Sequence, residues 1–121
     1  MGLLDNKFGI VTGSGPQVLV CDVNDDMGAE TVRLINAAGG EALYVHCDVS
    51  DEDSVRAMVD TALQAFGRLD IACNSAALSR GSGPIHLFDR GVFDQTLEMC
   101  LTNTWLCMKY EIAAMLEQLA R

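Results

Sequence analysis

Basic side chains are scarce in this chain. Its 121 residues include 17 Asp and Glu but only 8 Lys and Arg, which gives a formal net charge of -9. The bases do not cluster, so the sequence lacks the positive stripe that would neutralise phosphate groups, and we expect no nucleic-acid partner. The acidic residues gather instead at 22–26 and 48–53, where helices are expected to begin and where negative charge interacts favourably with the helix dipole.

Long hydrophobic runs are also missing. Half of the residues are hydrophobic, but no run approaches the ~20 residues that cross a bilayer. The first seven residues contain neither a basic leader nor a long apolar stretch, and Asn6 stands where a myristoylation motif has Ser or Thr. We therefore expect a cytoplasmic protein without a membrane anchor.

Histidine is rare and the cysteines do not pair. The two histidines, His46 and His86, lie forty residues apart, and the five cysteines are separated by 26, 26, 27 and 7 residues. Neither a disulfide framework nor a zinc site follows from this spacing, so we predict no metal site. Small buried thiols are expected at all five positions: Cys21, Cys47, Cys73, Cys100 and Cys107.

Apolar runs of strand length alternate with helical patterns along the rest of the chain. Strands are predicted at 8–11, 17–21, 42–47 and 69–73, and helices at 24–38, 50–66 and 89–119. Asn24 or Asp25 can cap the first helix and Ser50, with Asp53, the second; Gly39 and Gly67 are expected to end them. This alternation indicates one α/β domain over 1–121, with parallel strand pairing and helices on the faces of the sheet.

The first two predicted strands are too close in sequence to run in the same direction. A turn at Thr12-Gly13-Ser14-Gly15 and then Pro16 separate them. Residues 14–16 reach roughly 10 to 14 Å, whereas a parallel return must cover a strand of ~17 Å and needs a crossover of about a dozen residues. An antiparallel hairpin or a detached first strand remains open, and we favour the hairpin.

The helix predicted at 89–119 carries a long apolar stripe. Its members recur at near-helical intervals and include Val92, Leu97, Leu101, Trp105, Met108, Ile112, Met115 and Leu119. Such a stripe requires a large apolar partner surface. The partner is either the core of the same chain or a second chain.

Polar residues end the three later strands. Asp22, Asp48 and Asn74 all fall at the carboxyl ends, where ligands bind in parallel α/β sheets. Together with the glycine turn, the pair Asp48-Val49 and the run Gly67-Arg68-Leu69-Asp70 before Asn74-Ser75-Ala76-Ala77, these residues make the chain resemble the amino-terminal half of a short-chain dehydrogenase/reductase. The resemblance implies a partial, truncated Rossmann-like fold in three layers, and it extends to residues 106–110.

The same resemblance implies a site for NAD. By position, Asp22 would accept the ribose hydroxyls and favour NAD over NADP, because a carboxylate repels a 2'-phosphate. The complete set of implied cofactor-binding residues is Thr12, Gly13, Ser14, Gly15, Asp22, Asp48, Val49, Asn74, Ser75 and Ala76. The implied reaction is hydride transfer between NAD and a small alcohol or carbonyl substrate.

Several departures from the family pattern predict an inactive chain. Pro16 replaces the later part of the Thr-Gly-x-x-x-Gly-x-Gly turn and the helix after it, a loss of about twenty residues that predicts weak or no NAD binding. Cys100 stands where the family has an Asn in its long helix, and Asn103 where it has a Gly.

The proton-transfer machinery of the family is also missing. Its Ser and Tyr-x-x-x-Lys unit lies beyond the last residue of this chain, and the residues four positions after Tyr44 and Tyr110 are Asp48 and Ala114. We therefore assign no catalytic residue.

Features of the sequence raise three other functions. The main alternative is a noncatalytic binding or oligomerisation module that uses the 89–119 helix, and it remains open. A phosphoacceptor receiver domain would use the acidic cluster at Asp22, Asp25 and Asp26, but it needs a lysine at a late strand end, and Lys109 lies in a predicted helix. Acyl transfer needs a Ser in a sharp strand-to-helix turn, and the sequence contains no such turn.

Overall fold

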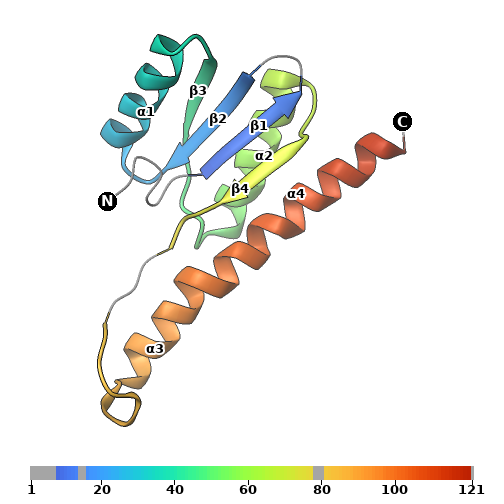
Figure 1. Ribbon diagram of the computed structural model, residues 1–121. Coiled ribbons are helices and arrows are strands. Elements are labelled where there is room, and N and C mark those ends of the chain that lie inside the picture. The colour runs from blue at the N-terminus through green and yellow to red at the C-terminus, as the bar shows by residue number, and fades with distance from the viewer. Residues whose placement is uncertain (1–7, 14–15, 78–80, 121) are drawn as a thin grey trace.

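The computed structural model describes residues 8–13, 16–77 and 81–120, which form a four-stranded sheet flanked by helices (Figure 1). In chain order the elements are β1 (Phe8–Gly13), β2 (Pro16–Asp22), α1 (Asp25–Ala37), β3 (Glu41–His46), α2 (Glu52–Phe66), β4 (Ile71–Asn74), a 3-10 turn η1 (Ile85–Leu87), α3 (Arg90–Leu97), a π-helical segment η2 (Glu98–Thr102) and α4 (Asn103–Leu119). The predicted α/β class is therefore confirmed.

The strand order is β3-β2-β1-β4, and β1 runs opposite to both of its neighbours. Gly13 pairs with Pro16, so β1 and β2 form the hairpin predicted from the short connection, whose turn residues Ser14 and Gly15 lie outside the described residues. Among the described strands, only β2 and β3 pair in parallel, joined by α1. The expectation of parallel pairing is thus wrong for β4, because the reversed β1 lies between β2 and β4 and pairs antiparallel with both.

The sheet lies between helices on its two faces. Leu19 and Cys21 of β2 point into the core that α2 and α4 line. Val20 points to the opposite face, where its partner Tyr44 on β3 lies against Gly28 of α1. The predicted three layers are therefore present, with α1 on one face and α2 and α4 on the other.

The core is built largely from β2, α2 and α4. Among its fully buried side chains are Leu19, Val55, Met58 and Leu69, with Cys107 contributed by α4. Full burial of an aliphatic side chain of this size contributes about 1.5–3 kcal/mol. This shared core holds α4 against α2 and so fixes its position beside the sheet.

Helix boundaries follow the predicted signals with one exception. Asn24 caps α1 by accepting the Met27 N–H at 3.0 Å, and Gly67, with φ of 77°, ends α2. Ser50 does not cap α2; Asp51 does, by accepting the Asp53 N–H at 3.2 Å. The Ser50 hydroxyl instead donates to Asp48 at 2.6 Å, because the shorter Asp–x–Ser turn competes for it.

The predicted 89–119 helix is present as α3, η2 and α4 in continuous succession. Figure 1 shows that α3 and the start of α4 extend beyond the sheet. The residues that α4 buries are Asn103, Leu106, Cys107, Glu111 and Ala114, whereas most of the apolar stripe is exposed, with Trp105 at 59%. The core of this chain is therefore not the partner surface of the whole stripe, although Met115 packs against that core.

The cysteine prediction holds for three of five positions. Cys21, Cys47 and Cys107 are buried, whereas Cys73 and Cys100 are exposed. Cys73 is exposed because β4 lies at the edge of the described sheet, and Cys100 because η2 extends beyond the sheet. In the part of the chain that the structure describes, no group of His, Cys, Asp and Glu could hold a metal ion, and no helix has the length and hydropathy to cross a membrane.

Candidate cofactor site

A cavity of about 300 Å³ lies at the carboxyl ends of the three later strands. Its wall comes from the end of β2, the first turn of α1, the segments after β3 and β4, and η2. The lining residues are Cys21, Asp22, Val23, Asn24, Met27, Cys47, Asp48, Val49, Ala76, Ala77 and Met99. The structure thus brings Asp22, Asp48, Val49 and Ala76 together around one cavity.

Asp22 has an incompletely bonded carboxylate at this cavity. Its side chain is 5% exposed, and Oδ1 accepts the backbone N–H of Asn24 at 3.0 Å. Oδ2 is buried and has no hydrogen-bond partner among the described residues. A buried carboxylate oxygen without a partner is costly, so Asp22 is suited to accept a hydrogen bond from a hydroxyl group of a ligand.

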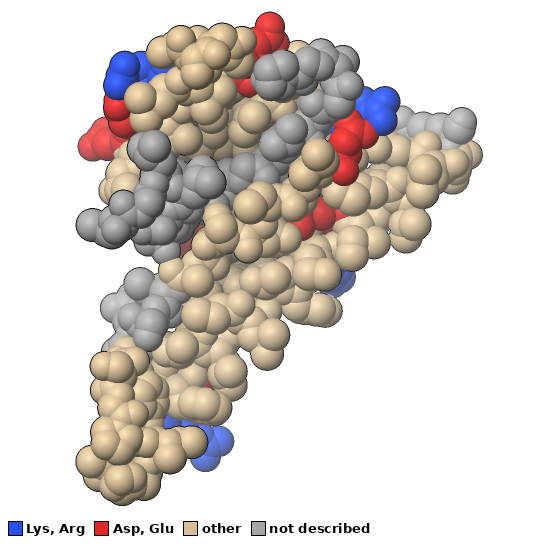
Figure 2. Space-filling model, viewed as in Figure 1, with Lys and Arg blue, Asp and Glu red and all other residues tan. Residues whose placement is uncertain are grey.

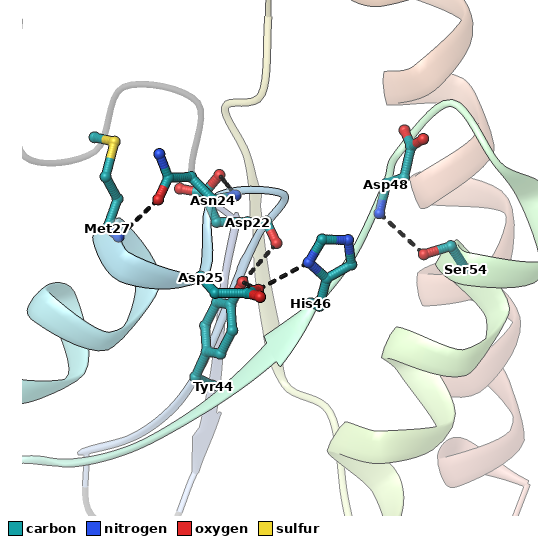
Figure 3. A network of polar contacts seen from close by, with 8 residues as sticks. All are labelled: Asp22, Asn24, Asp25, Met27, Tyr44, His46, Asp48 and Ser54. Carbon is teal, nitrogen blue, oxygen red and sulfur yellow. Dashed lines mark hydrogen bonds and ion pairs between the residues drawn. The ribbon is translucent and has the colours of Figure 1, made fainter.

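Asp48 and Val49 follow β3 on the other side of the cavity. The backbone N–H of Asp48 donates to the Ser54 hydroxyl of α2 at 2.9 Å (Figure 3). Asp48 Oδ1 accepts both the hydroxyl of Ser50 at 2.6 Å and its N–H at 3.0 Å, which lower the pKa of Asp48. The carboxylate therefore stays ionised as an acceptor, while Val49 is buried and adds apolar surface.

A polar network beside the cavity fixes the start of α1. The Tyr44 hydroxyl lies 2.8 Å from the carbonyl oxygen of Asp22 and 2.6 Å from Asp25 Oδ1, and His46 Nδ1 lies 2.8 Å from that same oxygen. Figure 3 shows Asp25 directed toward the side chains of Tyr44 and His46. These contacts lower the pKa of Asp25, first through the Tyr44 hydroxyl, and burial raises the pKa of Tyr44.

The end of β4 is joined to the long helix. Asn74 donates from Nδ2 to Glu111 Oε1 at 2.7 Å. Asn103, only 1% exposed, lies with Nδ2 3.3 Å from the carbonyl oxygen of Ala76 and 2.5 Å from that of Met99. Asn103 thus connects two parts of the cavity wall. Asn74 and Ser75, which were predicted at the site, do not line the cavity.

Thr12 and Gly13, the described part of the glycine turn, lie at the other end of the sheet. Phe8 is the β1 residue that pairs with Cys21 and Asn74, near the cavity, whereas Thr12 pairs with Gln17 at the start of β2. Thr12 and Gly13 therefore lie at the end of the sheet opposite to Asp22. Ser14 and Gly15 fall outside the described residues. The reversal of β1 separates the two halves of the predicted cofactor site.

Neither tyrosine lines the cavity. Tyr44 belongs to the network at α1, and the Tyr110 hydroxyl donates to Glu52 at 2.6 Å while it accepts from Arg56 at 3.3 Å. The Tyr44 hydroxyl thus contacts a cavity residue only at the backbone carbonyl of Asp22, and the Tyr110 hydroxyl is bonded to residues that do not line the cavity.

Sequence reasoning missed several residues of this region. Asn24 and Met27 come to the cavity because the first turn of α1 follows Asp22 directly, and this position could have been inferred from their distance in sequence. The position of Met99 could not have been inferred from the sequence, because it depends on how η2 and α4 pack against the segment after β4.

Comparison with known proteins places these features in a larger context. Residues 10–121 match the family model described as enoyl-(acyl carrier protein) reductase. The chain is 37% identical over 132 aligned positions to the uncharacterized oxidoreductase YxbG of Bacillus subtilis, covering 97% of this chain and 48% of that protein. It is 40% identical over 109 positions to a 2,5-dichloro-2,5-cyclohexadiene-1,4-diol dehydrogenase of Sphingobium indicum, covering 90% of this chain and 42% of that protein.

Among solved structures, a metagenomic short-chain oxidoreductase in complex with NADP matches with a TM-score of 0.74 and 28% identity, over 83% of this chain and 45% of that one. The chain therefore spans less than half the length of each of these proteins. The alignment with YxbG has 132 positions, more than the 121 residues of this chain. YxbG therefore has residues without a counterpart here.

Proposed function

Since the chain belongs to the short-chain dehydrogenase/reductase family, we propose that its cavity binds the adenosine part of a nicotinamide dinucleotide, with NAD preferred over NADP. The observation that carries this proposal is the buried Asp22 carboxylate at the end of β2, at a cavity of about 300 Å³, with one oxygen that has no hydrogen-bond partner in the part of the chain that the structure describes. A ribose has hydroxyl donors for this oxygen, and Val49 and Met27 supply apolar surface for an adenine ring.

The pyrophosphate part of the cofactor does not fit the same way. Tight binding of this group uses a glycine turn and the N-terminus of the helix after it. In this chain β1 runs antiparallel to β2, so Thr12 and Gly13 lie at the end of the sheet opposite to Asp22. The element after the turn is β2 and not a helix. We therefore expect NAD to bind weakly or not at all, and mostly through its adenosine.

The family reaction is hydride transfer between a nicotinamide and an alcohol or carbonyl group. We propose small alcohols or carbonyl compounds as the substrates of the complete oxidoreductase, a class supported by the diol dehydrogenase among the similar proteins. The present chain has no Tyr-x-x-x-Lys unit at Tyr44 or Tyr110, so we expect it to be inactive by itself. When bound, the nicotinamide would supply the hydride; this chain would contribute only adenosine contacts.

The test compares ligands that share adenosine. AMP and NADH should bind with dissociation constants within about tenfold of each other, because phosphate contacts add little here. Asp22→Asn should weaken both by roughly 0.5–1.5 kcal/mol, the net contribution of one hydrogen bond. Isothermal titration calorimetry for AMP and fluorescence titration for NADH would measure this.

The matched control is Asp26→Asn, an exposed carboxylate of α1 that does not line the cavity. It removes the same charge and should leave both affinities unchanged. Equal losses in the two variants would count against the ribose role of Asp22, and micromolar NADH binding would show that the glycine turn contributes normally.

A second candidate function is assembly through the long helix. Leu101, Trp105, Met108, Ile112 and Leu116 are exposed along α4 and η2, and in Figure 2 few charged atoms are visible along this helix. Exposed apolar surface of this extent is typical of an interaction site. We propose that two copies of the chain associate through this surface.

Light scattering over a concentration series tests the assembly. Ile112→Glu places a charge in the middle of the exposed stripe and should shift the equilibrium toward monomer. Ile85→Glu is the matched control, since Ile85 is 91% exposed and lies on η1 away from α4. A parent chain that stays monomeric at all concentrations would exclude this function.

A further inference from the structure

The pair Asn74 and Glu111 leaves two buried polar atoms without partners. Glu111 is 2% exposed on α4, and its Oε1 accepts from Asn74 Nδ2 at 2.7 Å. Glu111 Oε2 and Asn74 Oδ1 are both buried and have no hydrogen-bond partner among the described residues. With an ionised Glu111, both leftover atoms are acceptors, so they cannot bond to each other.

A proton on Glu111 would give both of these oxygen atoms a hydrogen-bond partner. An amide and a carboxylic acid each present one donor and one acceptor in a plane, so the two groups can join through two hydrogen bonds. We infer that Glu111 is a neutral carboxylic acid in the folded protein and that its Oε2–H donates to Asn74 Oδ1, which closes a two-bond ring between α4 and β4.

The surroundings of Glu111 favour the neutral form. Burial raises the pKa of Glu111, and the hydrogen bond from Asn74 opposes this only in part. Cys21 of β2 and Cys107 of α4 face its charge, and burial raises the pKa of both thiols, that of Cys107 to about 12, so they remain neutral. Cys47, after β3, lies beside these two thiols, and burial raises its pKa as well.

Glu111 has no compensating cation among the described residues. No basic side chain contributes to the pKa shift of Glu111. The charged residues Glu52 of α2 and Lys109 of α4 pair with each other at 2.9 Å in an exposed position. The sequence of β1 contains no titratable residue, and in β4 the sole titratable side chain, Cys73, is exposed. Ionisation of Glu111 would therefore leave a buried charge without a counterion.

The ring makes the attachment of α4 depend on pH. Because the pKa of Glu111 is higher in the folded than in the unfolded state, the folded state binds more protons, and this contribution to stability is lost as pH rises through the folded pKa. The ring lies beside the cavity wall, since Ala76 follows Asn74 by two residues and is held by Asn103. Higher pH should thus loosen this wall.

Glu111→Gln tests the ring directly, because a glutamine amide can form the same two bonds with Asn74 at every pH. Urea unfolding followed by circular dichroism would compare this variant with the parent between pH 4.5 and 8. We expect the ratio of the variant's unfolding constant to that of the parent to fall about tenfold or more as pH rises over this range. The reason is that the parent loses the ring at high pH, whereas the variant keeps it.

Glu98→Gln is the control, since it makes the same Glu-to-Gln replacement at an exposed position on η2. The inference is overturned if Glu111→Gln has the pH profile of Glu98→Gln, or if it fails to fold, since glutamine can make both bonds. A ¹³C NMR titration of the Glu111 carboxyl in the unsubstituted chain gives an independent answer. Titration in the ordinary range of a glutamate would overturn the inference, and a midpoint clearly above it would support it.

Discussion

At the scale of single residues, Gly28 determines how closely α1 approaches the sheet. A Cβ added there would overlap the ring of Tyr44. The ring has little freedom to move away, because its hydroxyl lies within hydrogen-bond distance of Asp22 and Asp25. The glycine is thus required by the close approach of helix and strand, and the contact it permits positions the helix that begins beside Asp22.

We expect Gly28→Ala to destabilise the chain by about 1–3 kcal/mol, because the added methyl group overpacks a tight contact. Urea denaturation followed by circular dichroism would measure the change. In Gly91→Ala, the control, the new Cβ meets only the end of the Asp89 side chain, and the change should be neutral or slightly stabilising, since Ala favours a helix. Equal effects at the two glycines would contradict the role of the Tyr44 ring.

At the scale of elements, the carboxy-terminal turns of α4 are joined to the segment before β4. Gln118 accepts the N–H of Leu69 at 2.6 Å and donates to its carbonyl oxygen at 3.0 Å. One side chain thereby bonds both polar groups of a backbone position whose side chain is fully buried. Together with Asn74 and Glu111, this contact attaches α4 to both ends of β4.

Gln118→Ala should lower the free energy of unfolding by about 1–3 kcal/mol, because it leaves two backbone groups of Leu69 without partners. The measurement is the urea midpoint. Gln95→Ala on the exposed surface of α3 is the matched control and should change stability by less than about 0.5 kcal/mol. A loss at Gln95 as large as that at Gln118 would mean that the Leu69 bonds contribute little.

At the scale of the whole molecule, the direction of β1 decides what the cavity can bind. The strand takes a place between β2 and β4 but runs opposite to both. The consequence is that Thr12 and Gly13 lie at the end of the sheet opposite to the Asp22 carboxylate. A crossover of sufficient length after Gly15 would allow β1 to run parallel to β2 and would bring the two ends together.

Inserting about twenty residues with a Gly-x-Gly turn and a helical sequence before Gln17 should therefore strengthen NADH binding by about tenfold or more, since it supplies the phosphate contacts of a helix N-terminus. NADH fluorescence titration measures this affinity. A flexible Gly-Ser insertion of the same length is the control, because it allows β1 to run parallel to β2 without providing the helix. If both insertions leave the affinity unchanged, the orientation of β1 is not what limits binding.

Much of the local structure followed from the amino-acid sequence alone. The short connection before Gln17 excluded a parallel pairing of the first two strands by chain length, Asn24 and Gly67 marked helix ends through their own hydrogen bonds and φ preference, and Asp22 marked the end of β2. Each of these depends on contacts within a few residues.

Tertiary structure decided what depends on residues distant in sequence. The burial of Glu111 against Asn74, the exposure of Trp105 and the arrival of Met99 at the cavity depend on how α4 rotates against α2 and β4. An apolar stripe on a helix does not reveal which face the core will use when the other face carries Asn103, Cys107 and Ala114, which are small enough to pack closely. Packing selects the face that allows close approach.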